Sequence, residues 1–326
     1  MKKRSIAILL ISAIIFSLIA VALVFVINNY IQIPNFKPTE NPAINYNNYV
    51  TSNSVDYRNG KFVWSGSTFL RVGTVVDTDG NIQKIYGVGD RIQLLDGGTA
   101  FLNQNTLVIN KKTKERVAEK VDSFTVTENG ILYARISDSY KKTLYWYDLA
   151  TSTAKVVAEN VAAYCADEQK IFVLDDSGQV TLYSETAVEK KIKIDIQSYP
   201  VTLMIQNNCL LYKSLNQLCL LDPDTGDIRN IVLSESKYIN NRIAYICDKD
   251  CIVYSFQATG TNGSIVTDID SPDNGIWIID PVSFEKQKLC DETFYSLYLW
   301  GDVLIGENGN GLYQISIADG ELTKIV

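Results

Sequence analysis

Three acids of this sequence lie close together in one long polar stretch. Asp268, Asp270 and Asp273 fall within ATGTNGSIVTDIDSPDNG, residues 258–275. Three close carboxylates could hold Ca²⁺, but the calcium-loop pattern D-x-[DN]-x-[DN]-G fails because Pro272 occupies its third ligand position. We predict these three acids as candidate binding residues of a surface loop, and an ordinary solvated loop is the alternative.

Other chemistry is limited by composition, because the chain contains no histidine. Ser-His-Asp and Cys-His catalysis and His-ligated metal sites are therefore excluded. The phosphate-binding patterns G-x-x-x-x-G-K-[ST] and G-x-G-x-x-G after a strand are also missing. Glycosidase chemistry needs only two acids, but no pair stands out among the 37 present. The sequence thus predicts no catalytic residue, no metal and no cofactor.

Cysteine and tryptophan each leave two interpretations open. Cys247 and Cys251 flank a turn and Cys209 and Cys219 flank another, so either pair could form a disulfide outside the cytoplasm. The alternative is buried free thiols, since each cysteine stands in an apolar run. Four tryptophans could stack on sugar rings, although apolar neighbours favour core packing. They are Trp64, Trp146, Trp277 and Trp300.

The elements that must position these residues follow a repeated pattern. Residues 144–159, LYWYDLATSTAKVVAE, contain an apolar run, an Asp, a small-residue turn and a second β-prone run. The same pattern recurs six times, with the Asp148 position occupied by Asp77, Asn110, Ser184, Asp222, Asp280 and Ser316. Most steps are about 33 to 38 residues and one is about 58, a period typical of four-stranded propeller blades. We predict an all-β propeller over residues 55–326 with seven blades, six or eight being alternatives.

The third repeat shows the expected blade most clearly. It reads DSFTVT, a turn at Asn129-Gly130, ILYARIS, a loop, TLYWYDL, another turn, and KVVAE. Asn-Gly between apolar runs supplies the positive φ angles of a tight hairpin. Both faces of TLYWYDL are apolar, which predicts a sheet covered on both sides by neighbouring blades. Asp148 and its equivalents are predicted to accept hydrogen bonds within turns rather than to act in catalysis.

The N-terminus predicts a membrane anchor. Lys2, Lys3 and Arg4 form a short cytoplasmic segment, residues 1–4, before an apolar run. A run of about 22 apolar residues can span a bilayer, whereas the apolar part of a cleaved signal peptide has about 7 to 15 residues. We therefore predict a retained signal anchor over residues 5–28, with a long cleaved signal as the alternative. Residues 29–54, rich in Asn and Pro, predict an extended stalk.

This topology places the propeller outside the cell, on a single-pass protein of the cell membrane whose N-terminus is cytoplasmic. Three of the 30 basic residues and none of the 37 acidic residues precede position 28, so the exported part is acidic. An acidic domain repels nucleic acid. The predicted partner is an extracellular protein or glycan, and the ectodomain is predicted to be monomeric.

LYWYDL, IWIIDP and LCLLDPDTG, together with NGILYA, resemble bacterial exported propeller domains likened to the YWTD propeller of low-density-lipoprotein-receptor-related proteins. The resemblance covers residues 57–326 and implies a propeller displayed outside the cell. It departs from the family in two ways: Tyr147 replaces the Thr of YWTD, and YWTD propellers have six blades. It implies no catalytic residues.

Two functional hypotheses follow. The first is a membrane-anchored binding or scaffolding module for an extracellular protein or glycan, because blade packing fixes the frame while loops vary. The second is a carboxylate-dependent polysaccharide hydrolase or lyase in the central funnel. The enzyme would need acids and aromatic residues from several blades to converge at one channel mouth.

Overall fold

The computed structural model describes the following parts of the chain. They are residues 15–19, 55–58, 60–67, 71–89, 91–166, 170–184, 187–194, 202–206, 209–214, 217–232, 242–246, 251–256, 271–280, 282–283, 285–294, 296–300 and 303–325. Residues 15–19 are helical, and within the described residues no helix is long and apolar enough to cross a membrane. The rest of the predicted anchor, residues 5–28, lies outside them, as do segments 1–4 and 29–54, so these assignments stay predictions.

The described strands form seven four-stranded antiparallel sheets, each built from four consecutive strands. Blade 1 contains β1 (Val55–Arg58), β2 (Lys61–Ser67), β3 (Val72–Asp77) and β4 (Ile82–Tyr86). Blade 2 contains β5 (Ile92–Leu95), β6 (Gly98–Asn103), β7 (Thr106–Asn110) and β8 (Lys114–Ala118). Blade 3 contains β9 (Val121–Val126), β10 (Gly130–Ile136), β11 (Lys142–Asp148) and β12 (Thr153–Glu159).

The remaining blades have the same order. Blade 4 contains β13 (Val161–Ala166), β14 (Lys170–Asp175), β15 (Gln179–Ser184) and β16 (Ala187–Lys193). Blade 5 contains β17 (Thr202–Gln206), β18 (Cys209–Ser214), β19 (Gln217–Leu221) and β20 (Ile228–Val232). Blade 6 contains β21 (Arg242–Ile246), β22 (Cys251–Phe256), β23 (Gly275–Ile279) and β24 (Lys286–Cys290). Blade 7 contains β25 (Ser296–Trp300), β26 (Val303–Asn308), β27 (Gly311–Ile315) and β28 (Leu322–Lys324).

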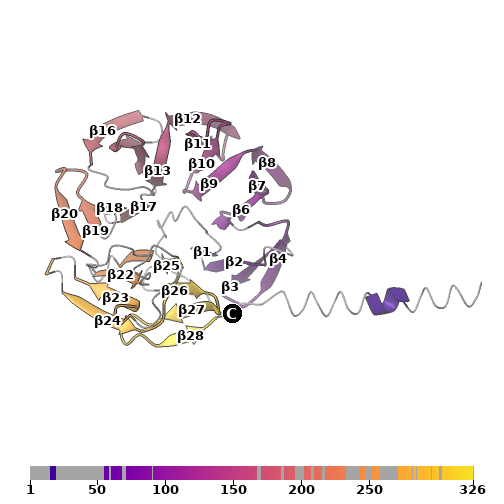
Figure 1. Ribbon diagram of the computed structural model, residues 1–326. Coiled ribbons are helices and arrows are strands. Elements are labelled where there is room, and N and C mark those ends of the chain that lie inside the picture. Colours follow the sequence, from indigo (N-terminus) through magenta and orange to yellow (C-terminus); the bar gives the residue numbers. More distant parts are fainter. Residues whose placement is uncertain are drawn as a thin grey trace, which may run out of the picture.

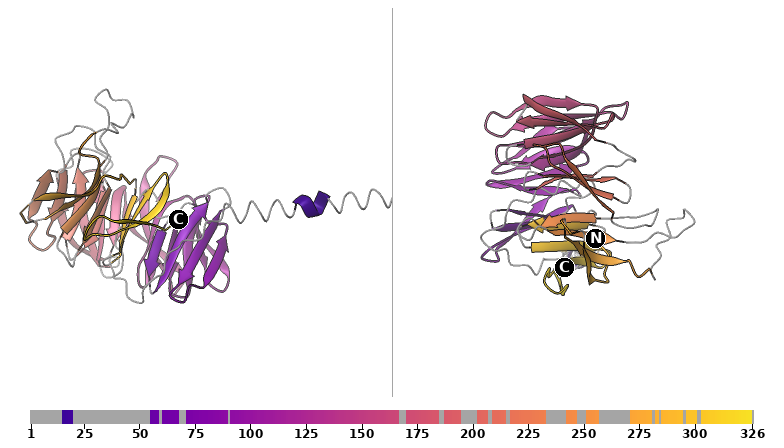
Figure 2. Two further views of the ribbon diagram at one scale, coloured as in Figure 1. Left: turned by 90° about the horizontal axis from the view of Figure 1, so that it is seen from below. Right: turned by 90° about the vertical axis from the view of Figure 1, so that its left-hand side faces the viewer.

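The seven sheets stand side by side in a ring (Figure 1), with the first strand of each blade nearest the centre and the fourth at the rim. Seen from the side, the strands cross the thickness of the disc (Figure 2). The prediction of seven blades is confirmed, and the first repeat is a complete blade. The seven predicted turn positions all stand at the end of a third strand or directly after it.

Blade 3 shows why the strands are apolar on both faces. Tyr145 and Tyr147 of β11 pack in a cluster with side chains of blade 2. Leu144 and Trp146, on the opposite face of the same strand, pack against side chains of blade 4. Alternate residues of one strand thus reach different neighbours, so a single blade leaves apolar surface exposed until both neighbours are in place.

The ring closes by side-chain packing between blades 7 and 1. Tyr57, Phe62 and Trp64 of blade 1 share a buried cluster with Tyr298 and Ile305 of blade 7. Every described strand pairs only within its own blade, so no strand is exchanged across this seam. Closure in the described structure therefore depends on apolar contacts rather than on a shared sheet.

The turn at Asn129-Gly130 corrects one prediction. Gly60, in the corresponding turn of blade 1, has a positive φ of 66°, as expected for a tight hairpin. Gly130 does not have a positive φ, and a Cβ placed there would collide with the ring of Trp146. Glycine is needed at this position because a tryptophan packs directly over the backbone, not because of its conformational freedom.

Polar side chains connect the inner strands of neighbouring blades. The first strand of each blade is an edge strand, so some of its backbone groups have no partner strand. Asp56 of β1 is buried, and its Oδ2 accepts a hydrogen bond of 2.7 Å from the backbone N–H of Leu94 in β5. Gln93 of β5 is also buried, and its Oε1 accepts one of 2.7 Å from Val126 N–H in β9. Blades 1 and 2 thus each satisfy a backbone donor of the next blade.

The outer strands are protected in a different way. A β-bulge interrupts the pairing of the third and fourth strands in blades 2, 3, 4 and 6. Every fourth strand also carries a cationic residue: Lys84, Lys114, Lys155, Lys190, Arg229, Lys286 and Lys324. Bulges and lysines are the devices that keep exposed sheet edges from pairing with other chains.

The cysteines differ in part from one interpretation of the sequence. Cys219 is a buried free thiol that lies opposite Tyr212 in the strand register, so a disulfide between Cys209 and Cys219 does not form. Cys165 is likewise free and buried. Cys247 lies outside the described residues, so its pairing with Cys251 remains untested.

The connection between blades 1 and 2 leads to a stability prediction. Replacing Asp56 by Ala removes the acceptor for Leu94 N–H, and loss of a buried partner lowers the free energy of unfolding by about 1–3 kcal/mol. Asp56→Asn keeps an acceptor oxygen and should lose less. Chemical denaturation of the three proteins measures the difference. Equal stability of Asp56→Ala and the native protein would show that this hydrogen bond does not hold the blades together.

Candidate functional site

Two kinds of connection emerge on one face of the disc. Strands alternate in direction within each blade, so the turns between second and third strands emerge on the same face as the connections between blades. We call this the 2–3 face. The predicted long loop joins β22 to β23 and so belongs to it.

Of the three predicted binding residues, the structure describes one. Asp268 and Asp270 lie outside the described residues. Asp273 is exposed and lies two residues before the start of β23, and its backbone carbonyl accepts a 2.8 Å hydrogen bond from the indole N–H of Trp277. Burial raises the pKa of the Tyr254 phenol, and the Asp273 carboxylate adds to that shift. The end of the long loop is thus attached to blade 6, while the predicted trio as a whole stays untested.

Trp277 stands between the core and the surface at this position. It is half-buried, and the Lys288 ammonium lies 5.8 Å from its ring centroid. Lys288 also donates a 3.0 Å hydrogen bond to the Pro272 carbonyl and pairs with Asp291 at 2.5 Å. Trp64 is buried, as core packing predicts, and Trp146 is half-buried within the cluster joining blades 3 and 4. The side chain of Trp300 is not among those described.

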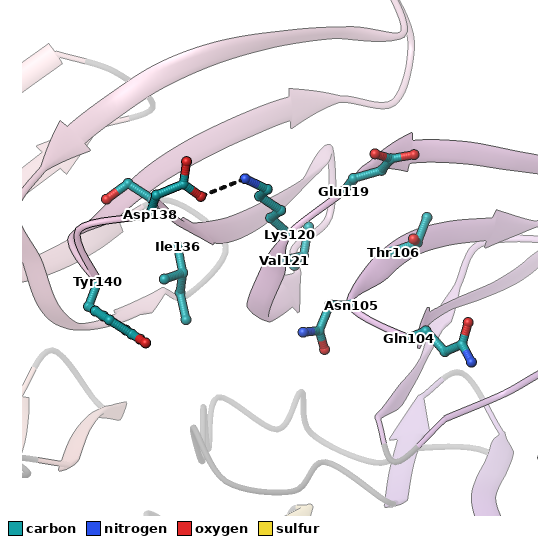
Figure 3. Close-up of a pocket in the computed structure, with 10 residues that line it drawn as sticks. Gln104, Asn105, Thr106, Glu119, Lys120, Val121, Ile136, Asp138 and Tyr140 are labelled. Carbon is teal, nitrogen blue, oxygen red and sulfur yellow. Dashed lines mark hydrogen bonds and ion pairs between the residues drawn. The ribbon is translucent and has the colours of Figure 1, made fainter.

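A cavity of about 600 Å³ opens on the 2–3 face between blades 2 and 3 (Figure 3). The turn between β6 and β7 contributes Gln104 and Asn105, and the connection between β8 and β9 contributes Glu119 and Lys120. This volume falls within the range of about 300–1,000 Å³ typical of small-molecule sites. We call this cavity the rim pocket.

The turn between β10 and β11 supplies the other wall of the rim pocket, including Ser137, Asp138 and Tyr140. Figure 3 shows Asp138 directed toward Lys120, with Tyr140 and Asn105 on opposite sides of the hollow. Three separate connections from two blades therefore meet at one cavity.

Backbone hydrogen bonds fix the base of the rim pocket. Asn105 has a φ of 61°, and its carbonyl accepts a 2.8 Å hydrogen bond from Val121 N–H at the start of blade 3. Lys120 has a φ of 57°, and its carbonyl accepts one of 3.0 Å from Ile136 N–H. Arg71 of blade 1 repeats the arrangement, with a φ of 51° and a 3.0 Å bond from Val88 N–H. These left-handed residues connect successive blades, so their conformation belongs to the frame.

Tyr140 is held in a tight turn. Its backbone N–H donates a 3.0 Å hydrogen bond to the Ser137 carbonyl, and Ser137 N–H donates one of 2.9 Å to the Lys141 carbonyl. The Ser137 and Ser139 hydroxyls are 2.9 Å apart. Tyr140 has a φ of 61°, and its side chain is 88% exposed.

The charges of the rim pocket are partly matched. Lys120 Nζ lies 2.8 Å from Asp138 Oδ1, and this ammonium holds the pKa of the Asp138 carboxyl below its ordinary value. Both side chains are exposed, so the ion pair contributes little to stability. Glu119 adds a second carboxylate, which gives the lining two acidic groups and one basic group.

The predicted turn acids behave as turn acceptors. Asp148 accepts backbone hydrogen bonds from two residues of the following turn, and Asp222 and Asp280 do the same in theirs. These bonds lower the pKa of all three carboxyls. A glycosidase acid needs a raised pKa, so these carboxyls do not suit that role. Within the described part of the chain, no group of three or more His, Cys, Asp or Glu could hold a metal ion.

Comparison with known proteins identifies the fold. No protein-family model matches this sequence, and neither does any curated protein. A chain in the crystal structure of the mitotic checkpoint complex matches with a TM-score of 0.59 at 12% identity, covering 87% of this chain and 94% of its own. The WD40 β-propeller domain of Doa1 matches with a TM-score of 0.54 at 11% identity, covering 86% and 96%. The chain has a β-propeller fold.

A third structural neighbour is Sqt1 from Saccharomyces cerevisiae, with a TM-score of 0.55 at 8% identity, covering 89% of this chain and 87% of that one. Identities this low show the fold alone. The propeller has one blade more than the YWTD type, so the blade count adds no support to that resemblance.

Sequence reasoning found the loop between β10 and β11 but not the rim pocket. The available signal was Tyr140 itself, a large aromatic residue within the polar run SDSYKK, where no apolar neighbour could bury it. The connection between β8 and β9 lies beside this turn because of the way blades 2 and 3 pack. The sequence pattern of one blade does not show this packing.

The turn acids lead to a prediction about pH. Hydrogen bonds keep the folded-state pKa of Asp148, Asp222 and Asp280 below the ordinary value of 3.8, so their stabilising contribution is present above pH 3.8 and lost as the pH falls through the folded-state pKa. A triple Asp→Asn variant keeps the acceptors but cannot titrate. Thermal unfolding below pH 3.8 should therefore depend less steeply on pH in the variant than in the native propeller. Parallel curves would contradict this assignment.

Proposed function

We propose that this propeller is a membrane-anchored, extracytoplasmic binding or scaffolding module that recognises an extracellular protein or glycan through its 2–3 face. The observation that carries the proposal is the rim pocket, where polar side chains of three connections converge on one cavity between two blades. Concave sites with a few convergent polar groups are the usual form of a ligand site.

The fold suits this role because frame and surface are separate. Apolar clusters between blades fix the disc, and the connections on the 2–3 face can differ without disturbing those clusters. One structural neighbour was solved within a multi-protein assembly, the mitotic checkpoint complex. By analogy we favour a binding role for this chain. The class of its partner has to be inferred from the residues on its own surface.

The membrane anchor and the extracellular location are parts of the same proposal. The basic residues before the apolar run favour a cytoplasmic N-terminus. The acidic exported part disfavours nucleic acid as a partner. The long loop with Asp268, Asp270 and Asp273 is proposed as a second contact on the 2–3 face.

Capture of partners tests the binding face. Full-length protein in mild detergent should retain an extracellular protein or glycan from an envelope extract. A variant that combines Lys120→Ala and Asp138→Ala with a short linker in place of residues 258–270 should lose it. The control combines Asp79→Ala and Glu128→Ala, two exposed acids in turns on the opposite face. Equal capture by all three proteins would contradict the proposed face.

Location can be tested independently. A reporter enzyme that is active only outside the cytoplasm, fused after Val326, should be active in cells and should remain with the membrane fraction. Deleting residues 5–27 should leave the fusion inactive in the cytosol, because the apolar run directs export. N-terminal sequencing of the full chain should find the basic segment intact. A mature protein that begins beyond residue 28 would show a cleaved signal instead of an anchor.

A further inference from the structure

Tyr140 occupies a position that does not serve the stability of the fold. Among the exposed large apolar side chains of the described residues it is the most exposed, at 88%. Its φ of 61° lies in the left-handed region, which is unfavourable for a bulky side chain. Four hydrogen bonds of the Ser137–Lys141 turn nevertheless hold its backbone there. An aromatic ring that is open to solvent and carried on a fixed, strained backbone is suited to contact a ligand.

The groups across the rim pocket indicate what kind of ligand would lie against this ring. Asn105 carries an amide, which both donates and accepts hydrogen bonds, and Asp138 carries a carboxylate, which only accepts. Thr106 and Ser137 add hydroxyls. Sugar hydroxyls also donate and accept, and a pyranose ring has an apolar C–H face that stacks on aromatic rings. The lining therefore matches both the hydroxyl groups and the apolar C–H face of a sugar.

Other ligand classes match less well. Lys120 is the one cationic side chain of the lining, and its ammonium is already paired with Asp138. Beside the lining, Arg135 donates a hydrogen bond to the Glu119 carbonyl and Arg71 donates one to Asn103, so these two cations also have acceptors. An anionic ligand would therefore have to replace an existing partner of a cation. A peptide usually needs an apolar pocket for an anchoring side chain. The lining has two aliphatic side chains: Val121 is 0% exposed, and Ile136 is half-buried, so the apolar surface is limited to one partly covered side chain.

We propose that the rim pocket binds a neutral sugar residue of a glycan, with the ring of Tyr140 stacked on its C–H face and Asn105 and Asp138 hydrogen-bonded to its hydroxyls. This inference deepens the proposed binding function and rests on it, because it names the ligand class of the same face. It assigns to Tyr140 the largest share of the affinity.

Glycan binding by matched variants provides the test. Full-length protein in detergent is applied to an array of neutral oligosaccharides of glucose, galactose, mannose and N-acetylglucosamine, beside uronate-containing oligosaccharides and a peptide array. Isothermal titration calorimetry then measures the affinity for the strongest neutral oligosaccharide. Tyr140→Asn suits the left-handed backbone better than tyrosine, so it should melt at the same temperature or higher. It should nevertheless bind at least about tenfold more weakly, while Tyr140→Phe keeps the ring and most of the affinity.

The results separate this inference from the broader one. Neutral-sugar binding that Tyr140→Asn weakens and Tyr140→Phe keeps supports the proposal. Binding unaffected by Tyr140→Asn, preference for uronates, or a Tyr140-dependent signal on the peptide array alone would overturn it. If no oligosaccharide binds at millimolar concentration but the 2–3 face still captures a protein, the sugar assignment fails and the binding module stands. Failure of both assays rejects both.

Discussion

The packing of each blade against two neighbours is the constraint on which the rest of this structure depends. β11 sends alternate side chains to blade 2 and to blade 4, so the core is distributed over the seams between sheets. No described strand is exchanged between the last blade and the first, and their seam is held by residues such as Tyr57, Phe62 and Tyr298. Apolar area buried at the seams therefore replaces the shared sheet that would otherwise close the ring. A blade removed from this ring would expose two apolar faces.

The buried polar groups near the centre follow from the same constraint. Placing a first strand beside the central axis leaves one of its edges without a partner strand, and unpaired backbone donors are costly when buried. Asp56 is the second residue of β1 and Gln93 is the second residue of β5. Each side chain accepts a hydrogen bond from such a donor in the first strand of the next blade. Left-handed residues on the 2–3 face make a related connection through their carbonyls. The base of the rim pocket is built from two of these connections, which explains how a surface cavity can be rigid.

The sequence predicted what depends on local pattern. The repeat period located the third strand of each blade, because an apolar run followed by a turn has a local physical cause. Asp148 does accept hydrogen bonds from the turn that follows its strand. Gly130 was assigned to a turn but begins β10, and the ring of Trp146 that excludes a Cβ there belongs to another strand. Cys209 and Cys219 flank the right hairpin, yet strand register places Tyr212 opposite Cys219. The rim pocket was missed because it joins residues of two blades.

The outer strands have a consequence for molecules that meet one another at the rim. Each disc presents seven strand edges around its circumference, and every one carries a cation, while four are also interrupted by a bulge. Two such rims repel each other and offer mismatched backbone spacing, so growth of a common sheet from one copy to the next is disfavoured. Crowding of many copies would therefore bring rims together without giving them a template for strand addition.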